Sequence, residues 1–483
     1  MFPKGFKFGF SEAGFQFEMG ISDVDPNTDW YVWSHDEYNI RNKLVSGDFP
    51  ENGAGYWDLY EKDHVMASYL GMNAARLGIE WSRIFPRSTE EIKVSVDDEN
   101  DDVFHVDITE KDVEKLQKVS NSGAVKHYRD IFTDLKSRGS YLILNLYHWS
   151  TPKWINDPTK RDIQKDNAVG NCFNKRSIIE FAKFAAFVSY TYDDLVDKWS
   201  TMNEPNIVFN GQCSTDMSQS AIARRKKAFA EAHAMAYDSI KKFSKKPVGI
   251  IYANGDMQAL TQDDQAAKEM AEYEIRYSFF EAITKGKLPW LTKASDQLGE
   301  NKIVIDRKDM SRHLDWVGVN YYSRDVVSSE KSSWKIVNGY GYASGDADKS
   351  LDGRSLSDTG WEVYPEGLYN LVMSYNDHLG LPMMITENGV ADDLDRIRPR
   401  YIASHLKNLE KAMRSGANVD GYMHWALTDN YEWASGFSKR FGLLRVDFAT
   451  KKRYIRPSAL VLKNIIENKG VTDELEWIAS DKF

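Results

Sequence analysis

Hydrophobic positions along the chain fall into short continuous runs, separated by longer stretches with helical periodicity. Eight runs rich in β-branched and aromatic residues predict strands at residues 7–13, 73–80, 141–147, 199–203, 248–254, 314–321, 383–386 and 419–426. Runs such as YLILNLY at 141–147 and VGIIYAN at 248–254 are almost entirely apolar, which is typical of parallel strands buried on both faces. The pattern therefore predicts a parallel sheet.

Amphipathic stretches between these runs are long enough to be crossover helices. The clearest lie at residues 124–138, 177–197, 221–243 and 399–415. Eight strands alternating with helices favour a closed barrel over a doubly wound sheet. No Pro/Gly/Ser-rich linker divides the 483 residues. We expect an α/β fold in which residues 1–483 form a single (β/α)8 TIM barrel, with the active site at the C-terminal ends of the strands.

Two segments depart from this pattern. Residues 90–102 (EEIKVSVDDENDD) are strongly acidic, and we expect residues 90–123 to form a surface insertion in the barrel; a metal-binding acid cluster is the alternative. Glycines at 339, 341 and 345 do not follow a strand that opens a helix. A dinucleotide-binding loop is therefore not predicted there.

Charge and cysteine content exclude several function classes. The 72 acidic side chains outnumber the 62 basic ones, which argues against a nucleic-acid partner. Cys172 and Cys213 are too few for a disulfide framework and lack CxxC spacing, so neither an oxidising compartment nor a zinc ribbon is indicated. The N-terminal MFPKGFKFGF lacks the apolar segment of a signal peptide, and no window approaches ~20 apolar residues. We expect a cytoplasmic protein without membrane association.

Polar groups and indoles gather where the predicted strands end, which is where such barrels carry their chemistry. In strand order these are Gln16, Arg76, His148 and Trp149, Asn203 and Glu204, Asn254, Asn320 and Tyr322, Glu387, and Trp425. A single Glu at a strand end is more often a salt-bridge partner than a catalyst. Glu204 and Glu387, however, terminate strands four and seven and should face one another across the barrel mouth. Glycoside hydrolysis needs such a pair: one carboxyl protonates the leaving oxygen and the other acts on the opposite side of the anomeric carbon.

Several motifs resemble glycoside hydrolase family 1, the retaining β-glycosidases, and most closely its archaeal β-glucosidase/β-galactosidase branch. They are FGFSEAGFQFEMG at 8–20, TMNEP at 201–205, ITENGVADD at 385–393 and DGYMHWALTDNYEWASGFSKRFGLLRVD at 420–447. The similarity runs over nearly the whole chain. It implies a retaining exo-β-glycosidase that removes terminal β-D-glucosyl, β-D-galactosyl or fucosyl residues from disaccharides, oligosaccharides and aryl glucosides.

The resemblance also implies roles for individual residues. Glu204 would be the general acid/base and Glu387 the nucleophile, with Arg76 and Tyr322 beside Glu387. A cation and a phenol hydroxyl favour the ionised carboxylate and so should lower the pKa of Glu387. Glu204 must be protonated before attack, so an apolar setting or a neighbouring negative charge must hold its pKa up.

A second set of residues matches the family's sugar-binding positions. The resemblance assigns substrate binding to Gln16, His148, Trp149, Asn203, Asn320, Trp361, Trp425, Glu432, Trp433 and Phe441. Carboxylates and carboxamides bind vicinal hydroxyls in bidentate fashion, and Trp425 would lie beneath the sugar ring. Taken singly, Gln16 and His148 would also fit satisfied core polar groups, and the tryptophans would fit packing. The resemblance implies no cofactor and no metal, and it implies a homo-oligomer, either a dimer or a tetramer.

The match has two gaps. Residues 207–220 (IVFNGQCSTDMSQS) replace the Gly/Pro-rich loop that usually follows NEP and helps to wall the leaving-group side, and residues 170–173 lack the usual Gly-Gly-Trp. A 6-phospho-β-glycosidase is an alternative within the class; those relatives tend to have Ser in place of Glu432 and Tyr in place of Phe441, together with a Lys such as Lys439. A non-catalytic sugar-binding barrel and a metal-dependent hydrolase are alternatives from other classes.

Overall fold

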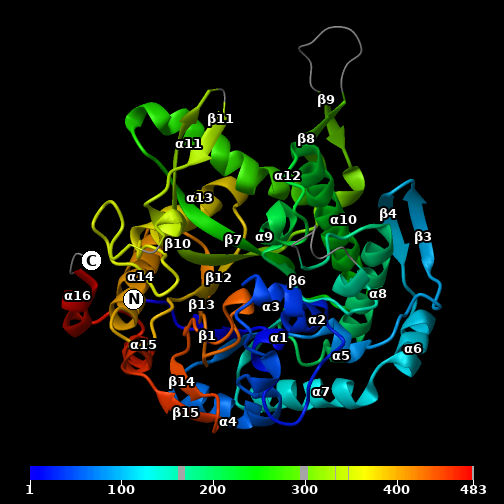
Figure 1. Ribbon diagram of the computed structural model, residues 1–483, viewed down its shortest axis with the longest axis horizontal. Coiled ribbons are helices and arrows are strands. Elements are labelled where there is room, and N and C mark those ends of the chain that lie inside the picture. Colours follow the sequence, from blue (N-terminus) through cyan, green and yellow to red (C-terminus); the bar gives the residue numbers. More distant parts are fainter. Residues whose placement is uncertain (161–168, 294–302, 332, 346, 481–483) are drawn as a thin grey trace.

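Eight parallel strands close into a barrel in the computed structural model, which describes residues 1–160, 169–293, 303–331, 333–345 and 347–480 (Figure 1). They are β1 (Lys7–Glu12), β2 (Ala74–Gly78), β5 (Tyr141–Tyr147), β6 (Lys198–Asn203), β7 (Val248–Ala259), β10 (Trp316–Glu330), β12 (Met383–Asn388) and β13 (Val419–His424). The hydrogen-bonded order is β10-β12-β13-β1-β2-β5-β6-β7, and pairing of β10 with β7 closes the ring. The predicted (β/α)8 barrel and its eight strands are confirmed.

Two strands run well past their predicted ends. Pairing of β7 with β10 continues beyond the barrel rim as far as Ala259 and Val327, and β11 (Ser333–Ile336) folds back on β10 in antiparallel fashion. The apolar runs stop near residues 254 and 321 because the outer parts of these strands also carry polar side chains, among them buried Asp256, Ser323 and Arg324. The hydrophobic pattern therefore predicted only those parts of the two strands that lie inside the barrel.

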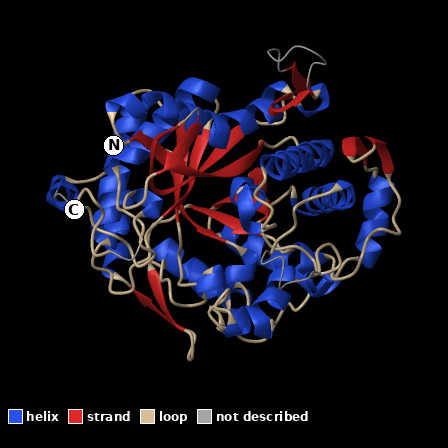
Figure 2. Cartoon of the chain, turned by 45° about the horizontal axis from the view of Figure 1, so that its top comes forward, coloured by secondary structure: helices blue, strands red, loops and turns tan. Residues whose placement is uncertain are grey.

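Helices surround the barrel, as Figure 2 shows. The four clearest predicted helices are confirmed as α7 (Ser122–Ser137), α8 (Lys175–Tyr192), α10 (Gln219–Phe243) and α14 (Arg398–Arg414), although α8 ends before residue 197. The other α-helices of the described residues are α1 (Gly14–Phe17), α2 (Asp29–His35), α3 (Glu37–Arg41), α4 (Tyr56–Tyr69), α5 (Trp81–Ile84), α6 (Glu110–Val119), α9 (Pro205–Ile207), α11 (Gln265–Glu272), α12 (Ser278–Lys285), α13 (Glu366–Leu379), α15 (Pro457–Asn468) and α16 (Asp473–Ser480). Among the described residues, no helix has the length and apolar character needed to cross a bilayer.

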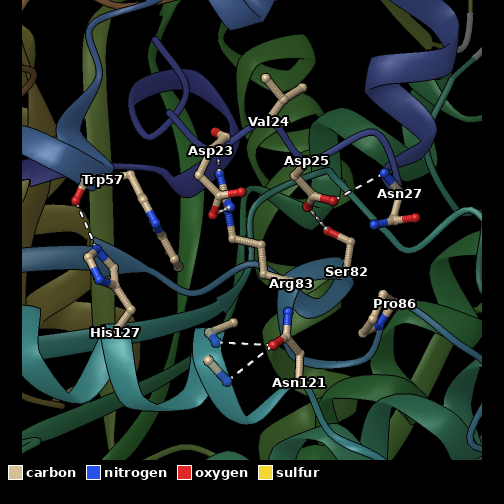
Figure 3. Close-up of a pocket in the computed structure, with 12 residues that line it drawn as sticks. Asp23, Val24, Asp25, Asn27, Trp57, Ser82, Arg83, Pro86, Asn121 and His127 are labelled. Carbon is tan, nitrogen blue, oxygen red and sulfur yellow. Dashed lines mark hydrogen bonds and ion pairs between the residues drawn. The ribbon is translucent and has the colours of Figure 1, made fainter. Parts of the chain in front are cut away.

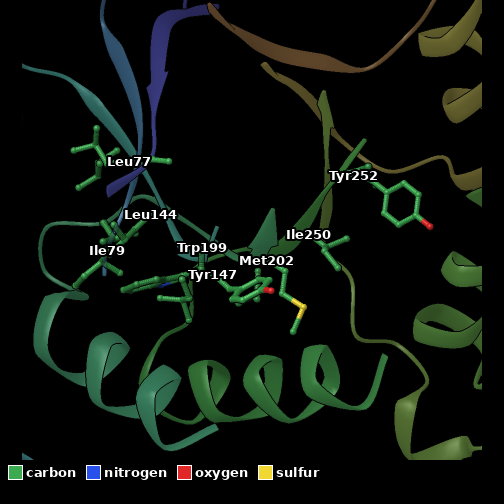
Figure 4. Packing of buried hydrophobic residues seen from close by; sticks show 14 of the residues in the cluster. Leu77, Ile79, Leu144, Tyr147, Trp199, Met202, Ile250 and Tyr252 are labelled. Carbon is green, nitrogen blue, oxygen red and sulfur yellow. The ribbon is translucent and has the colours of Figure 1, made fainter. Parts of the chain in front are cut away.

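Both faces of the barrel strands are buried in apolar surroundings. One cluster lies between strands and helices, and Figure 4 shows part of it, including Leu77, Leu144, Trp199 and Ile250. A second, smaller cluster combines Ala74, Ile143, Ile251, Trp316, Met384 and Met423, one side chain from each of six barrel strands. Burial on both sides explains why the strands read as continuous apolar runs.

The acidic segment forms a hairpin, β3 (Ser95–Glu99) with β4 (Asp102–Asp107), at the edge of the molecule beside α8 and α10 (Figure 1). Three of the hairpin's carboxylates pair with lysines of these helices: Asp98 with Lys175, Asp102 with Lys227 and Asp107 with Lys242. These carboxylates are thus neutralised by protein cations, which removes the reason for reading them as a metal site.

A disulfide joins Cys172 to Cys213, which are 41 positions apart in the sequence. The number and spacing of the cysteines did not predict this bond. Count and spacing detect frameworks and metal motifs, whereas a single bridge depends on two loops meeting in space.

Candidate active site

Glu204 and Glu387 occupy the C-terminal ends of β6 and β12, with β7 and β10 between those strands in the ring. Glu204 directly follows β6 in a left-handed backbone conformation (φ 47°), and only 8% of its surface is exposed. Glu387 is 4% exposed. Asn320 of β10 lies between the strands, and its Nδ2 donates to Glu204 Oε1 (2.8 Å) and to Asn203 Oδ1 (3.0 Å).

Both oxygens of Glu387 accept hydrogen bonds from the two residues predicted to lie beside it. Arg76 Nη1 donates to Oε1 at 2.7 Å, and the Tyr322 hydroxyl donates to Oε2 at 2.6 Å. Arg76 is fully buried, and its Nη2 donates to Asn203 Oδ1 at 2.7 Å. One guanidinium therefore connects the nucleophile candidate with the residue that precedes Glu204.

Burial raises the pKa of both carboxyls, and the groups around each carboxyl shift the two pKa values by different amounts. The pKa of Glu204 rises to about 8, because burial and the negative charge of Glu387 outweigh the donor from Asn320 and the charge of Arg76. Burial also raises the pKa of Glu387, which Arg76 and Tyr322 oppose. Arg76 and Tyr322 thus act in the predicted direction, but the prediction that the pKa of Glu387 falls is wrong because desolvation outweighs them.

Gln16 and Glu432 lie side by side at the mouth of the barrel. Gln16 Nε2 is 3.1 Å from Asn430 Oδ1 and 3.4 Å from Glu432 Oε2, and among the described residues no partner reaches Gln16 Oε1. Burial and the charge of Glu387 raise the pKa of Glu432 to about 8. The structure therefore places a carboxamide beside a carboxyl group.

His148 sits between the polar and the aromatic parts of the site. Its ring nitrogens lie 3.1 Å from Asn203 Nδ2 and 3.3 Å from Arg76 Nη2. Burial and the charge of Arg76 lower the pKa of His148 well below its usual value, so the ring is neutral. The ring also stacks at 5.9 Å between centroids on both Trp425 and Trp433.

The remaining predicted aromatic residues join the same assembly. Trp149 contacts Trp433 with ring centroids 5.0 Å apart. Trp361 and Phe441 lie 5.4 and 6.0 Å from the Tyr322 ring. The fold therefore brings all of the predicted site residues into one connected group, and their roles stay predictions.

The sequence interpretation missed two residues that contact this group. Asn430 accepts from Gln16, and its position two residues before Glu432, in a stretch already matched to the family, was an available signal. The Tyr342 hydroxyl accepts hydrogen bonds from the backbone N–H groups of Tyr322 and Ser323. No motif pointed to Tyr342, because its loop reaches the site only through the fold.

The two departures from the family pattern meet in space. The disulfide joins residues 170–173 to residues 207–220, and Val169 N donates to Gln212 O (3.0 Å) next to it. Val169 also packs in a cluster with Trp433 and Trp149. The atypical segments therefore form one cross-linked wall beside the aromatic part of the site.

A separate polar cavity of about 400 Å³ lies between residues 23–27, α5 and α7 (Figure 3). Its polar groups pair with one another: Arg83 Nη1 donates to Asp23 Oδ2 (2.6 Å), and Ser82 Oγ donates to Asp25 Oδ2 (2.5 Å). His127 Nε2 lies 2.8 Å from Trp57 O. None of the predicted site residues lines this cavity, so it does not compete with the carboxylate pair as the reactive centre.

Comparison with known proteins gives one consistent result. The model of the family "Glycosyl hydrolase family 1" matches residues 1–96 and 115–471. The chain is 47% identical to a β-galactosidase of Saccharolobus solfataricus over 99% of this chain and 98% of that protein. Among solved structures, the β-glycosidase of Thermosphaera aggregans is 44% identical with a TM-score of 0.91, covering 99% of both chains. A β-glucosidase mutant described as derived from a hyperthermophilic tetrameric structure is 45% identical with a TM-score of 0.88, covering 99% of this chain and 98% of that one.

Proposed function

The chain belongs to glycosyl hydrolase family 1, and from that premise we propose that this β-glycosidase removes terminal β-D-glucosyl and β-D-galactosyl residues with retention of the anomeric configuration. The observation that carries the proposal is the unequal setting of two buried carboxyls. Glu387 receives a guanidinium and a phenol hydroxyl, whereas Glu204 has, among the described residues, a single amide donor and a pKa of about 8. One group is thus prepared as an anion and the other as an acid.

In the proposed first step, Glu387 attacks the anomeric carbon while protonated Glu204 gives its proton to the leaving oxygen. Arg76 and Tyr322 hold both Glu387 oxygens in fixed directions, which limits the motion needed to reach the sugar. The aglycone leaves as an alcohol, and a covalent glycosyl-enzyme forms.

In the proposed second step, the roles of the Glu204 carboxyl reverse. Esterification removes the negative charge of Glu387, which is one of the causes that raise the pKa of Glu204. The Glu204 pKa therefore falls, and the ionised group takes a proton from the attacking water. Glu387 is released, and the product keeps the β configuration.

Glucose and galactose differ only in the orientation of the 4-hydroxyl. Gln16 and Glu432 lie within 3.4 Å of each other and present several acceptors and donors, so either epimer finds a partner. The same pair would accept the axial 4-hydroxyl of a fucosyl residue. One lost hydrogen bond to a charged group costs roughly 1.5–3 kcal/mol. We therefore propose discrimination between the two sugars of no more than about two orders of magnitude.

In the part of the chain that the structure describes, no specific contact favours the 6-phospho-β-glycosidase or the non-catalytic sugar-binding barrel. A phosphate would meet the Glu432 carboxyl, and Lys439 Nζ already donates to the Asp358 carbonyl. A non-catalytic barrel would not need two differently tuned carboxyls.

Three further expectations remain proposals. A homo-oligomer is supported by the tetrameric origin given for one structural relative. A surface insertion at 90–123 is supported by the family model, which omits residues 97–114. A cytoplasmic location is the third, and the disulfide between Cys172 and Cys213 counts against it, because such bonds persist mainly in oxidising compartments.

The experiment is a substrate panel of aryl and alkyl β-glucosides, β-galactosides and β-fucosides with short β-linked oligosaccharides, followed by NMR of the first product. The proposal expects hydrolysis of both glucosides and galactosides and the β-anomer as the first product. An α-anomer as the first product, or the absence of turnover on every β-glycoside, would overturn it.

A further inference from the structure

Strand β10 contains a bulge at the residue that contacts Glu387. Its pairing with β7 runs Tyr321↔Asn254 and resumes at Arg324↔Asp256, so two residues of β10, Tyr322 and Ser323, face a single residue of β7. A bulge removes ladder partners from the extra residue and bends the strand. The backbone N–H groups of Tyr322 and Ser323 therefore need a partner from elsewhere.

The Tyr342 hydroxyl supplies that partner. It accepts from Tyr322 N and Ser323 N, each at 3.2 Å, and donates to Asn254 O at 3.0 Å. On the other side of the same residue, the Tyr401 hydroxyl donates to Tyr322 O at 3.1 Å. The backbone of Tyr322 is thus held through its N–H and its C=O by two tyrosine hydroxyls.

Tyr342 belongs to a glycine-containing loop at residues 339–345, and this loop places its side chain beside the bulge. The residue lies in a single helical turn, Gly341–Ala343, and Gly341 N donates to buried Glu362 Oε2 at 2.7 Å. Arg324 binds both oxygens of Glu362, at 2.8 and 2.9 Å, which fastens the loop to β10 just beyond the bulge. Gly341 has φ +55°, and a Cβ there would lie 1.8 Å from Arg324 O, so a larger residue would push the loop away. Gly341, one of the three glycines for which no dinucleotide-binding loop is predicted, therefore has a structural role in this loop.

We propose that Tyr342 is a positioning residue for the nucleophile: its hydroxyl fixes the bulged backbone of Tyr322 and thereby aims the Tyr322 hydroxyl at Glu387. The inference rests on the proposed role of Glu387. The 2.6 Å bond between Tyr322 and Glu387 depends on a side chain whose backbone lies outside regular pairing. Removing the Tyr342 hydroxyl frees that backbone, lengthens the bond and leaves the Glu387 anion less stabilised.

The test is Tyr342→Phe, with kcat/KM for an aryl β-glucoside measured against pH. We expect kcat/KM to fall by about tenfold to a hundredfold, since small misplacements at a reacting group cost rates of that order. The acidic limb of the profile should move upward by about 0.5–1 pH unit, since a weaker hydrogen bond to the anion raises its pKa. KM should change little. Tyr340→Phe is the matched control, because it removes the same atom from the same loop and its hydroxyl makes no hydrogen bond among the described residues; its profile should equal that of the wild type.

A double-mutant cycle with Tyr322→Phe separates positioning from stability. If Tyr342 acts through Tyr322, adding Tyr342→Phe to Tyr322→Phe should change kcat/KM less than twofold to threefold. The proposal would be overturned if the two substitutions lowered kcat/KM by factors that multiply in the double variant, or if the acidic limb of Tyr342→Phe did not move. A lower melting temperature of Tyr342→Phe would not rescue it. Should Tyr342→Phe not fold, Gly341→Ala, which displaces the loop but keeps the hydroxyl, must show the same shift of the acidic limb, and an unshifted limb would overturn the proposal.

If the proposed role of Glu387 is itself wrong, the pH profiles of the variants differ in another way. If Glu387 is not the nucleophile, Tyr322→Phe alone leaves the acidic limb in place. If only the Tyr342 inference fails, Tyr322→Phe moves the limb and Tyr342→Phe does not.

Discussion

Replacing Arg76 by methionine tests how the buried site keeps a carboxylate ionised. Arg76 is fully buried and donates to Glu387 Oε1 and Asn203 Oδ1, each at 2.7 Å. Methionine fills much of the same volume but supplies neither the charge nor the hydrogen bonds. Burial, the largest cause acting on the pKa of Glu387, would then be opposed chiefly by Tyr322.

The expected shift follows from the lost bond. A hydrogen bond to a charged group contributes roughly 1.5–3 kcal/mol, and each pKa unit corresponds to about 1.4 kcal/mol. The pKa of Glu387 should therefore rise by about 1–2 units. Since the nucleophile must be ionised, the acidic limb of kcat/KM should move upward by the same amount, and activity below that limb should fall by about tenfold to a hundredfold.

Stability should change with pH in a defined direction. The pKa of Glu387 in the folded state already lies above that of the unfolded chain. Such a group costs stability only where it is ionised, so the deficit of Arg76→Met should vanish at low pH and grow as the pH rises through the range between the two pKa values. A rise of about 1–2 pKa units limits this pH-dependent deficit to roughly 1.4–2.7 kcal/mol.

The assay is kcat/KM from pH 4 to 9, with thermal unfolding measured at each pH. Arg453→Met is the matched control, because the Arg453 side chain is only 7% exposed and binds both oxygens of buried Asp63 at 2.8 Å. It should lose comparable stability and keep the wild-type acidic limb. A wild-type limb in Arg76→Met, or an equal shift in Arg453→Met, would refute the reasoning.

Three further outcomes are expected. Glu204→Gln should lower hydrolysis of alkyl glycosides by about 10²–10⁴-fold, because their leaving groups need a proton, yet release dinitrophenol in a burst from a dinitrophenyl glucoside; a burst in Glu387→Gln instead would exchange the two roles. Since the pKa of Glu432 is about 8, rejection of an aryl glucoside 6-phosphate should strengthen as the pH rises past 8, and Glu432→Ser should weaken it; preference for the phosphorylated substrate in the wild type would contradict this. Replacing both Cys172 and Cys213 by serine should cost roughly 2–4 kcal/mol of unfolding free energy and raise KM for oligosaccharides more than for aryl glucosides; an unchanged ratio of the two KM values would show that the cross-linked wall does not contact the aglycone.

The barrel could be predicted because strands buried on both faces consist almost entirely of apolar residues. Strand β5, YLILNLY, is apolar except for Asn145 because helices cover one side of it and the barrel interior the other. The outer half of β10 has no such apolar run, so its extent was not predicted.

The carboxylate pair was predictable because each Glu ends a buried strand, where a charge has no packing role. The residues and bonds that hold the surroundings of this pair in place could not be predicted from the sequence. Tyr342 reaches Tyr322 from a loop whose sequence shows only scattered glycines, and Cys172 meets Cys213 only because two loops converge. The net direction of the pKa shift of Glu387 was also misjudged, because a sequence shows the neighbouring charges but not the completeness of burial.

Trapping of the glycosyl-enzyme tests the central claim most directly. A dinitrophenyl 2-deoxy-2-fluoro-β-D-glucoside has a reactive leaving group, and its fluorine slows both steps, so a retaining enzyme should accumulate the covalent intermediate. We predict a mass increase of one fluoroglucosyl group per chain, carried by the peptide that contains Glu387 and released by added glycosyl acceptor. A label on Glu204 or on any other residue, or dinitrophenol release at a steady rate with no covalent adduct, would contradict the assignment of Glu387 as the nucleophile.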